Sequence, residues 1–140
     1  IIGFEFIKEK NVIGFSNSPF RAELIPEKLS IPQDVAVVDW FFYTLLLHAG
    51  HKAVFSNEMI TYYRQYSDNM IGINNETLDN YKKKLALKAM HYRYLSSSFT
   101  EFEELAKKYS KEKNLTDIQV STLLQNNKIT YPLWWENIKI

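Results

Sequence analysis

The chain has 140 residues, which is enough for one domain with a buried core. Hydrophobic residues make up 46% of the sequence and charged residues 24%, a composition that argues against a disordered chain. The net charge of +1 gives no general case for binding nucleic acid or anionic membranes, and the lack of cysteine excludes disulfides and thiolate metal sites. No apolar run reaches the roughly 18 residues that would span a bilayer. We expect a cytoplasmic protein, and leave open whether it works at the inner face of the membrane.

The N-terminal segment predicts two short strands, at residues 2–7 and 12–15, separated by a charged turn. The chain opens on an apolar residue, Ile1, without an initiator methionine and without a polar approach. We therefore expect that it was cut from a longer protein.

A loop of small polar residues follows at residues 14–18. It leads to Pro19, a residue favoured at the first position of a helix, and Ser18 is the natural N-cap. Residues 20–25 then predict one or two helical turns before Pro26.

The apolar run over residues 35–49 predicts the main buried helix, and Gly50 ends it as a residue able to take a positive φ. One carboxylate, Asp39, stands at the start of this run beside Trp40. An acid in the first turn is stabilised by the helix dipole and accepts hydrogen bonds from free backbone N–H groups. Taken alone, Asp39 is therefore either a capping residue or a catalytic or ligand-binding carboxylate at the edge of a cleft.

Beyond Gly50, residues 52–55 and 59–63 are β-branched and aromatic, and predict two further short strands or extended segments. Residues 64–72 are polar, lack a period and end in glycine, and so predict a loop.

The second half of the sequence has the period of helices. Apolar residues recur every three or four positions after Asn75, a candidate cap, and form one inward stripe of Leu78, Tyr81, Leu85, Ala89, Tyr92 and Leu95. A second helix is predicted from Phe99 or Thr100, with Phe102, Leu105, Ala106 and Tyr109 turned inward. A third is predicted over residues 116–124 with Thr116 as its cap, and the aromatic tail at 131–138 is expected to dock on the body.

These elements predict an α+β fold that is mainly helical. We divide the chain into a mixed region at residues 1–73 and a helical extension at residues 74–140.

Few other residues suggest chemistry. His48 and His51 straddle the end of the predicted helix with no acid at a ligand spacing, so no metal site is predicted in this chain. His91 is expected to be a packing or surface residue. The run Lys82–Lys84 among tyrosines resembles a basic-aromatic nucleic-acid face, but at helical spacing it is better explained as a solvated face beside a core stripe.

The order of the motifs is more informative than any one of them. A small polar loop with Phe-Arg is followed by Ile-Pro, by Asp-Trp opening an apolar helix, by Ala-Gly-His-Lys, and by Tyr-Tyr-Arg-Gln-Tyr-Ser-Asp-Asn-Met-Ile-Gly. Over about residues 11–72 this order resembles the C-terminal half of bacterial family 2 glycosyltransferases, enzymes of the GT-A fold that make polysaccharides. The helical remainder looks like the variable C-terminal extension of such enzymes.

The resemblance implies roles for particular residues. Asp39 matches the general base of inverting members, which takes the proton of the acceptor hydroxyl, and Trp40 would stack on a sugar face. The loop with Gly14, Ser16, Asn17 and Ser18 matches the acceptor-side loop. Arg64, Gln65 and Asn69 match a motif that would contact the donor phosphates or order the loop, although Tyr66 stands where the family often has His.

The nucleotide-binding half of the family is not visible in this sequence, because there is no Asp-x-Asp motif and no first βαβ unit. The resemblance implies a nucleotide-sugar donor, a glycan or lipid-linked acceptor and a divalent metal, Mg or Mn, in the full-length parent. We expect neither a metal nor turnover in this chain by itself.

Two alternatives remain open: a helical protein-interaction domain without enzymatic activity, and a fragment of another enzyme or a nucleic-acid module. A truncated enzyme would also have lost the partners of residues 1–15 and of the 35–49 helix. Self-association through that exposed apolar surface is therefore expected, and nucleic acid is not expected as a partner.

Overall fold

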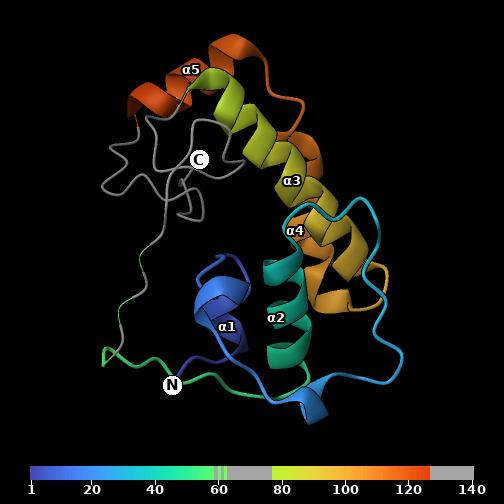
Figure 1. Ribbon diagram of the computed structural model, residues 1–140. Helices are drawn as coiled ribbons and strands as arrows, with labels where there is room; N and C mark the ends of the chain where they lie inside the picture. The colour runs from blue at the N-terminus through green and yellow to red at the C-terminus, as the bar shows by residue number, and fades with distance from the viewer. Residues whose placement is uncertain (59, 61, 63–76, 127–140) are drawn as a thin grey trace. The chain divides into compact units, whose positions relative to one another are not determined.

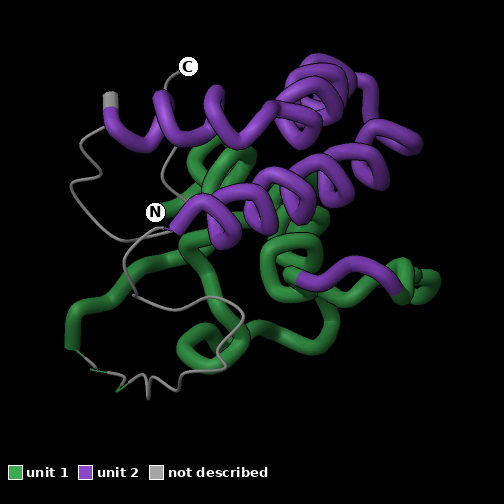
Figure 2. The backbone as a smooth tube through the Cα atoms, turned by 90° about the horizontal axis from the view of Figure 1, so that it is seen from above, with its two compact units in different colours: residues 1–33, 37–72 green, residues 34–36, 73–140 purple. Residues whose placement is uncertain are grey.

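The computed structural model describes residues 1–58, 60, 62 and 77–126. The chain forms two compact units: unit 1 comprises residues 1–33 and 37–72, and unit 2 comprises residues 34–36 and 73–140 (Figure 2). The boundary predicted between residues 73 and 74 lies outside the described residues. Within those residues, none of the helices combines the length and the hydrophobicity that crossing a membrane requires.

Unit 1 is built around two helices, α1 (Phe4–Ile7) and α2 (Val38–His48), which lie side by side (Figure 1). The indole N–H of Trp40 on α2 donates a hydrogen bond of 2.9 Å to the backbone carbonyl of Ile7 at the end of α1. At the other end of α2, the ring of His48 meets that of Phe4 edge-on, with centroids 5.1 Å apart. The short η1 (Phe15–Asn17) and η2 (Ala22–Leu24) follow α1 in the chain.

The strands predicted at residues 2–7 and 12–15 are wrong, and residues 52–55, predicted as a strand or an extended segment, do not form a strand. Residues 4–7 form a helical turn, residues 15–17 a 3₁₀ turn, and of the predicted strand at 52–55 only Ala53 pairs, in one isolated antiparallel bridge with Ile2. That bridge has both of its N–H···O bonds, at 2.7 and 2.9 Å. An apolar alternation over four to six residues does not distinguish a strand from a helical turn, and a strand needs a neighbour along its whole length.

The strand or extended segment predicted at residues 59–63 lies mostly outside the described residues, whereas the first helix prediction needs correction. Of residues 59–63 only 60 and 62 are described, and neither is in a strand. The helix predicted over residues 20–25 is the shorter η2, and its N-cap is Arg21 and not Ser18. The mainly helical part of the predicted fold class is confirmed; the strands of an α+β fold are not found in the described residues.

Helix α2 begins at Val38, three residues later than predicted, and ends at His48. Gly50 has φ of +92°, which confirms its predicted role in ending the helix. The residues of α2 that are buried are Trp40, Phe41, Phe42, Tyr43, Thr44, Leu46 and Leu47. The expectation that this helix exposes an apolar face is therefore wrong.

Unit 2 consists of α3 (Leu78–Ser96), η3 (Thr100–Phe102), α4 (Glu103–Glu112) and α5 (Asp117–Asn126), and α3 packs against both α4 and α5 (Figure 1). Most of the predicted stripe is buried, namely Tyr81, Leu85, Ala89, Tyr92 and Leu95. The ring of Tyr92 stacks on that of Tyr109 of α4, with centroids 5.1 Å apart. These contacts confirm the predicted helical core.

Of the two N-caps predicted for unit 2, the cap of α3 differs from the prediction and the cap of α5 agrees with it. The N-cap of α3 is Thr77, whose hydroxyl accepts from the Asn80 N–H, and Asn75 lies outside the described residues. At α5 the prediction is confirmed: the Thr116 hydroxyl accepts from the Gln119 N–H, while the Gln119 side chain accepts from the Thr116 N–H. The predicted tail at 131–138 is outside the described residues.

Candidate functional site

The carboxylate of Asp39 lies in the first turn of α2 and is half-buried. Its Oδ1 accepts two hydrogen bonds, one of 2.7 Å from the Trp40 N–H and one of 3.2 Å from the side-chain amide of Asn11. The N-cap residue, Val37, has no side chain able to satisfy the free N–H groups of the turn. Oδ1 of Asp39 therefore satisfies one of the free N–H groups of the first turn, as a capping side chain would.

The predicted acceptor-side loop folds against this carboxylate. The Asn17 side-chain oxygen accepts from the Gly14 N–H at 3.2 Å and from the Ser18 hydroxyl at 3.1 Å, so the loop closes on itself. A Cβ placed on Gly14 would lie 3.5 Å from Asp39 Oδ2 and 3.9 Å from the Ser16 hydroxyl oxygen. Asp39, Gly14, Ser16 and Asn17, which are separated by more than twenty residues in the sequence, thus come together in unit 1.

The loop is also tied to α2 one turn beyond Asp39. The Tyr43 hydroxyl donates a hydrogen bond of 2.8 Å to the Ser18 carbonyl. The pKa of Tyr43 is raised, first because burial disfavours the phenolate and further because the negative charge of Asp39 is close. Tyr43 therefore stays a neutral donor, and its hydrogen bond keeps the loop in place at neutral pH.

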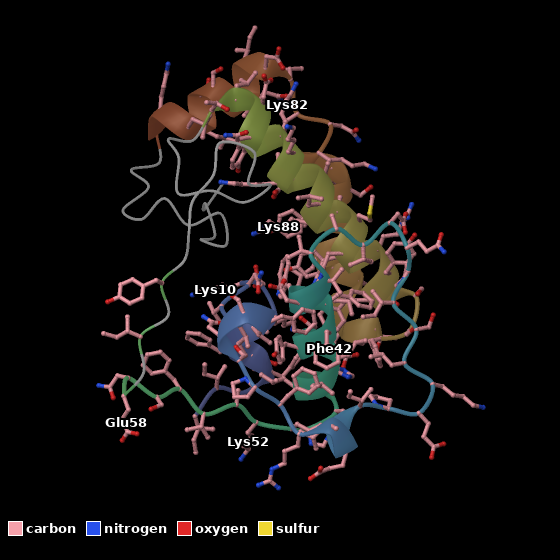
Figure 3. All side chains as sticks on the ribbon, in the orientation of Figure 1. Lys10, Phe42, Lys52, Glu58, Lys82 and Lys88 are labelled. Atoms are coloured by element: carbon pink, nitrogen blue, oxygen red, sulfur yellow. The ribbon has the colours of Figure 1, made fainter. Side chains whose placement is uncertain are left out.

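Aromatic rings hold the loop against the helix. The ring centroid of Phe15 lies 5.3 Å from that of Phe42 and 5.5 Å from that of Tyr43, and Phe20 lies 4.9 Å from Phe42. Figure 3 places Phe42 on α2. Phe15 and Phe20 are 46% and 42% exposed. Their rings therefore pack on α2 and also leave part of their apolar surface exposed to solvent, in and next to the polar loop.

Trp40 does not have the place that the sequence suggested. It is 1% exposed, and its indole N–H is bonded to the carbonyl of Ile7. A ring with so little free surface cannot stack on a sugar in this arrangement. Trp40 is instead the residue that joins α1 to α2.

Asn11 was missed by sequence reasoning. It lies 28 residues from Asp39 in the chain, in the charged turn predicted between residues 7 and 12, so no sequence signal marked it as a site residue. Three other predicted site residues, Arg64, Gln65 and Asn69, lie outside the described residues.

No group of three or more His, Asp or Glu side chains in the described parts of the chain is arranged to hold a metal ion. No step of the proposed reaction is assigned to the divalent metal that the resemblance implies for the parent. His48 is engaged with the ring of Phe4, as a helix-end histidine would be.

Unit 2 contains polar groups that are buried inside its helices. Lys88 of α3 (Figure 3) donates a hydrogen bond of 3.3 Å to the Tyr109 hydroxyl and lies 5.1 Å from the centre of that ring. The pKa of His91 is lowered to about 3, because burial disfavours the imidazolium and the positive charge of Lys88 is near. His91 is a packing residue, which confirms one of its two predicted roles.

The lysines 82–84 of α3 and the tyrosines near them do not form one exposed basic-aromatic surface. Lys82 pairs with Asp117 of α5, whereas Tyr81 and Tyr92 are buried. This arrangement agrees with a solvated row of lysines beside a core stripe.

No protein-family model, curated protein or solved structure matches this chain.

Proposed function

We propose that this chain is the acceptor-side part of an inverting glycosyltransferase, in which Asp39 is the general base. The observation that carries the proposal is that Gly14, in the loop closed by its hydrogen bond to Asn17, lies near the Asp39 carboxylate: a Cβ built on Gly14 would be 3.5 Å from Oδ2. The resemblance implied that this loop lies on the acceptor side and that Asp39 is the general base, and Gly14 and Asp39 are 25 positions apart in the sequence.

The reaction requires one proton transfer and one exchange of bonds at carbon. Asp39 accepts the proton of the acceptor hydroxyl while the hydroxyl oxygen forms a bond to the anomeric carbon of the donor sugar. The bond from that carbon to the nucleoside diphosphate breaks, and the diphosphate leaves with the bonding electron pair, which inverts the configuration. A half-buried carboxylate with one oxygen that accepts no hydrogen bond from the described residues suits this role, because the base must lie within about 2.6–3.2 Å of the hydroxyl oxygen whose proton it removes.

The surroundings of Asp39 support a hydroxyl-rich acceptor such as a glycan or the glycan of a lipid-linked carrier. Ser16 and Asn17 are exposed and offer a hydroxyl and an amide. The exposed parts of Phe15 and Phe20 offer an apolar surface for the carbon-bound hydrogens of a sugar ring, a role that Trp40 cannot fill. The nucleotide-sugar is expected to bind to the nucleotide-binding half of the parent, so the chain alone should not turn over.

The test is the Asp39→Asn variant of the protein expressed from its complete gene. Release of nucleoside diphosphate from a panel of nucleotide-sugars, with and without glycan acceptors, measures transfer. We expect Asp39→Asn to lower acceptor-dependent release by about 10²- to 10⁴-fold while donor binding stays within twofold, because only the base is lost. Transfer at the rate of the unmodified protein would refute the assignment.

The matched control is Asp79→Asn. Asp79 is the second residue of α3, as Asp39 is of α2, so both substitutions remove one negative charge from the same helical position. Loss of transfer in both variants would point to a stability effect and not to base catalysis.

A second candidate function rests on a different part of unit 1. Val54, Phe55, Ile60 and Tyr62 are each between 74% and 92% exposed, an apolar set that favours self-association or a protein partner. Sedimentation velocity over a hundredfold range of concentration tests it. Association that is weakened by Phe55→Ser, but not by Lys52→Ser nearby, would support this candidate, and a monomer at all concentrations would contradict it.

A further inference from the structure

The two oxygens of Asp39 have different surroundings. Oδ1 accepts both hydrogen bonds that the carboxylate receives from described residues, at 2.7 and 3.2 Å. Oδ2 points toward the backbone of Gly14, 3.5 Å from where a Cβ would be. Hydrogen bonds lower the basicity of an oxygen that accepts them, so the two oxygens differ as proton acceptors.

We propose that Asn11 is the positioning residue of this site: it holds Oδ1, so that Oδ2 receives the proton of the acceptor hydroxyl in the space that Gly14 leaves open. This inference rests on the proposed function, and it adds to it which atom accepts the proton and which residue orients that atom.

The orientation of the Asn11 amide follows from its neighbours. Its nitrogen must face Asp39, because the flipped amide would set its oxygen against a carboxylate oxygen, two acceptors without a hydrogen between them. The Asn11 oxygen is then buried and has no hydrogen-bond partner among the described residues. A buried amide oxygen without a partner costs stability, and an asparagine kept at such a cost is more readily explained by its bond to Asp39 than by packing.

The nearby chain fixes the position of Asn11. Ile13, two residues later, is 6% exposed and anchors the segment in the core. The Trp40 N–H belongs to the backbone of α2 and donates to the same oxygen. Two donors from separate segments therefore set the rotation of the Asp39 carboxylate, and neither is a long side chain that would have to be ordered first.

Gly14 is needed for space and not for its backbone conformation. Its φ of −101° and ψ of 150° are extended values that any residue adopts. A methyl group there would meet Asn17 Oδ1 at 3.4 Å and Asp39 Oδ2 at 3.5 Å, which are ordinary contact distances. Gly14→Ala should therefore fold normally and yet cover the side of Oδ2 from which a hydroxyl would approach.

In the reaction step, the acceptor O–H bond breaks and its proton goes to Asp39 Oδ2, while Oδ1 keeps both of its hydrogen bonds. The electron pair of that O–H bond forms the new bond to the anomeric carbon, and the nucleoside diphosphate leaves with the pair of the bond that breaks. Asp39 later returns the proton to water.

The first experiment measures kcat and KM in the full-length protein. We expect Asn11→Ala to lower kcat about 10- to 100-fold with the donor KM within twofold, because an unoriented base affects the reaction and not donor binding. Gly14→Ala should lower kcat similarly and raise the acceptor KM. Asn114→Ala is the control, since Asn114 only bonds a backbone carbonyl at the end of α4.

A double-mutant comparison separates this inference from the proposed function. In the Asp39→Asn background, Asn11→Ala should cause no further loss, because the group that it orients is already gone. If Asp39→Asn is inactive but Asn11→Ala keeps the full kcat, the inference is overturned and the function stands. If Asp39→Asn is fully active, the proposed function itself fails.

A second experiment needs no activity. In the 140-residue chain, the side-chain amide protons of Asn11 should exchange with water at least tenfold faster in Asp39→Ala than in the unmodified chain, as measured by NMR, while those of Asn114 stay unchanged. Equal exchange of the Asn11 protons in both chains would show that the amide is not held by the carboxylate, and would overturn the inference whatever the kinetics.

Discussion

The two units use their polar side chains in opposite ways. In unit 1, Asp39 and the polar loop beside it are half-buried or exposed, and both hydrogen bonds that the carboxylate accepts from described residues go to Oδ1. In unit 2, Lys88 and His91 are 5% and 3% exposed, and lie among the aromatic rings of α3 and α4. The polar side chains of the candidate site in unit 1 are thus near the surface, whereas Lys88 and His91 of unit 2 are inside its core.

This difference in burial indicates which polar groups are candidates for catalysis. A perturbed pKa often marks an active site, and by that criterion alone His91 would be the first candidate. Its pKa is low because it is buried, and a group that no substrate reaches cannot exchange a proton with one. Asp39 combines fixed neighbours with one oxygen that accepts no hydrogen bond from the described residues, which is what a base requires.

The largest expected effect tests whether unit 2 is held by its aromatic core. Tyr92 is fully buried and stacks on Tyr109, so Tyr92→Ala should lower the free energy of unfolding by about 3–5 kcal/mol. Denaturant titration measures this loss. Lys83→Ala, on the exposed side of the same helix, should change it by less than about 0.5 kcal/mol. Equal effects of the two would show that the stack is not part of a packed core.

Acid should act on unit 2 through His91. The unfolded chain binds a proton at this residue near pH 6.5, whereas the folded chain binds it only near pH 3. The contribution to stability is therefore complete above pH 6.5 and is lost as the pH falls from 6.5 toward 3, and at pH 4 the loss is about 3 kcal/mol.

His91→Leu isolates this effect from the carboxylates, which titrate in both chains. The free energy of unfolding of the unmodified chain should fall more steeply between pH 7 and pH 4 than that of His91→Leu, whereas His51→Leu should keep the steep slope. Parallel slopes for the unmodified chain and His91→Leu would mean that the imidazole is not kept neutral by burial.

The sequence predicted unit 2 better than unit 1, for a physical reason. The stripe of α3 repeats over 19 residues, so chance departures at single positions, such as buried Lys88, do not hide the helical period. The Thr116–Gln119 cap is local, because its partners are three residues apart. In contrast, residues 2–7 are too few to show a period, and what they pair with is decided by contacts distant in sequence.

The same reasoning explains what was found of the site. Asp39 was predicted in the first turn of a helix from local pattern, but the loop around Gly14 was assigned to it only through the order of motifs. Asn11 could not be found, because a hydrogen bond across 28 residues leaves no local pattern. Trp40 was expected at the sugar-binding surface but is buried, because the residue type alone does not tell which side of a helix faces the core.

A smaller effect is expected in unit 1, where Trp40 joins α1 to α2. Trp40→Phe keeps an aromatic ring but removes the donor to the Ile7 carbonyl, and should cost about 1–3 kcal/mol. Urea titration measures the loss, and hydrogen exchange should show faster opening of the amides of residues 4–7. Val38→Ala, on the exposed side of α2, is the control and should stay within about 0.5 kcal/mol. Unchanged exchange at residues 4–7 would mean that this bond does not hold α1.

The smallest effect returns to the caps, where the two units also differ. Helix α5 of unit 2 has a reciprocal cap between Thr116 and Gln119, whereas the N-cap residue of α2 in unit 1, Val37, provides no side-chain cap, and Asp39 accepts a backbone N–H inside the first turn. Thr116→Ala should lower the free energy of unfolding by about 1 kcal/mol, and Thr116→Ser, which keeps the hydroxyl, should restore most of it. Thermal unfolding of the three chains measures the difference. If Thr116→Ser is as unstable as Thr116→Ala, the lost methyl group and not the cap explains the effect. If Thr116→Ser regains the stability, the hydroxyl cap is what stabilises the start of α5. Helix α2 differs, because the carboxylate in its first turn uses only Oδ1 for the hydrogen bonds from described residues and keeps Oδ2 for a second role.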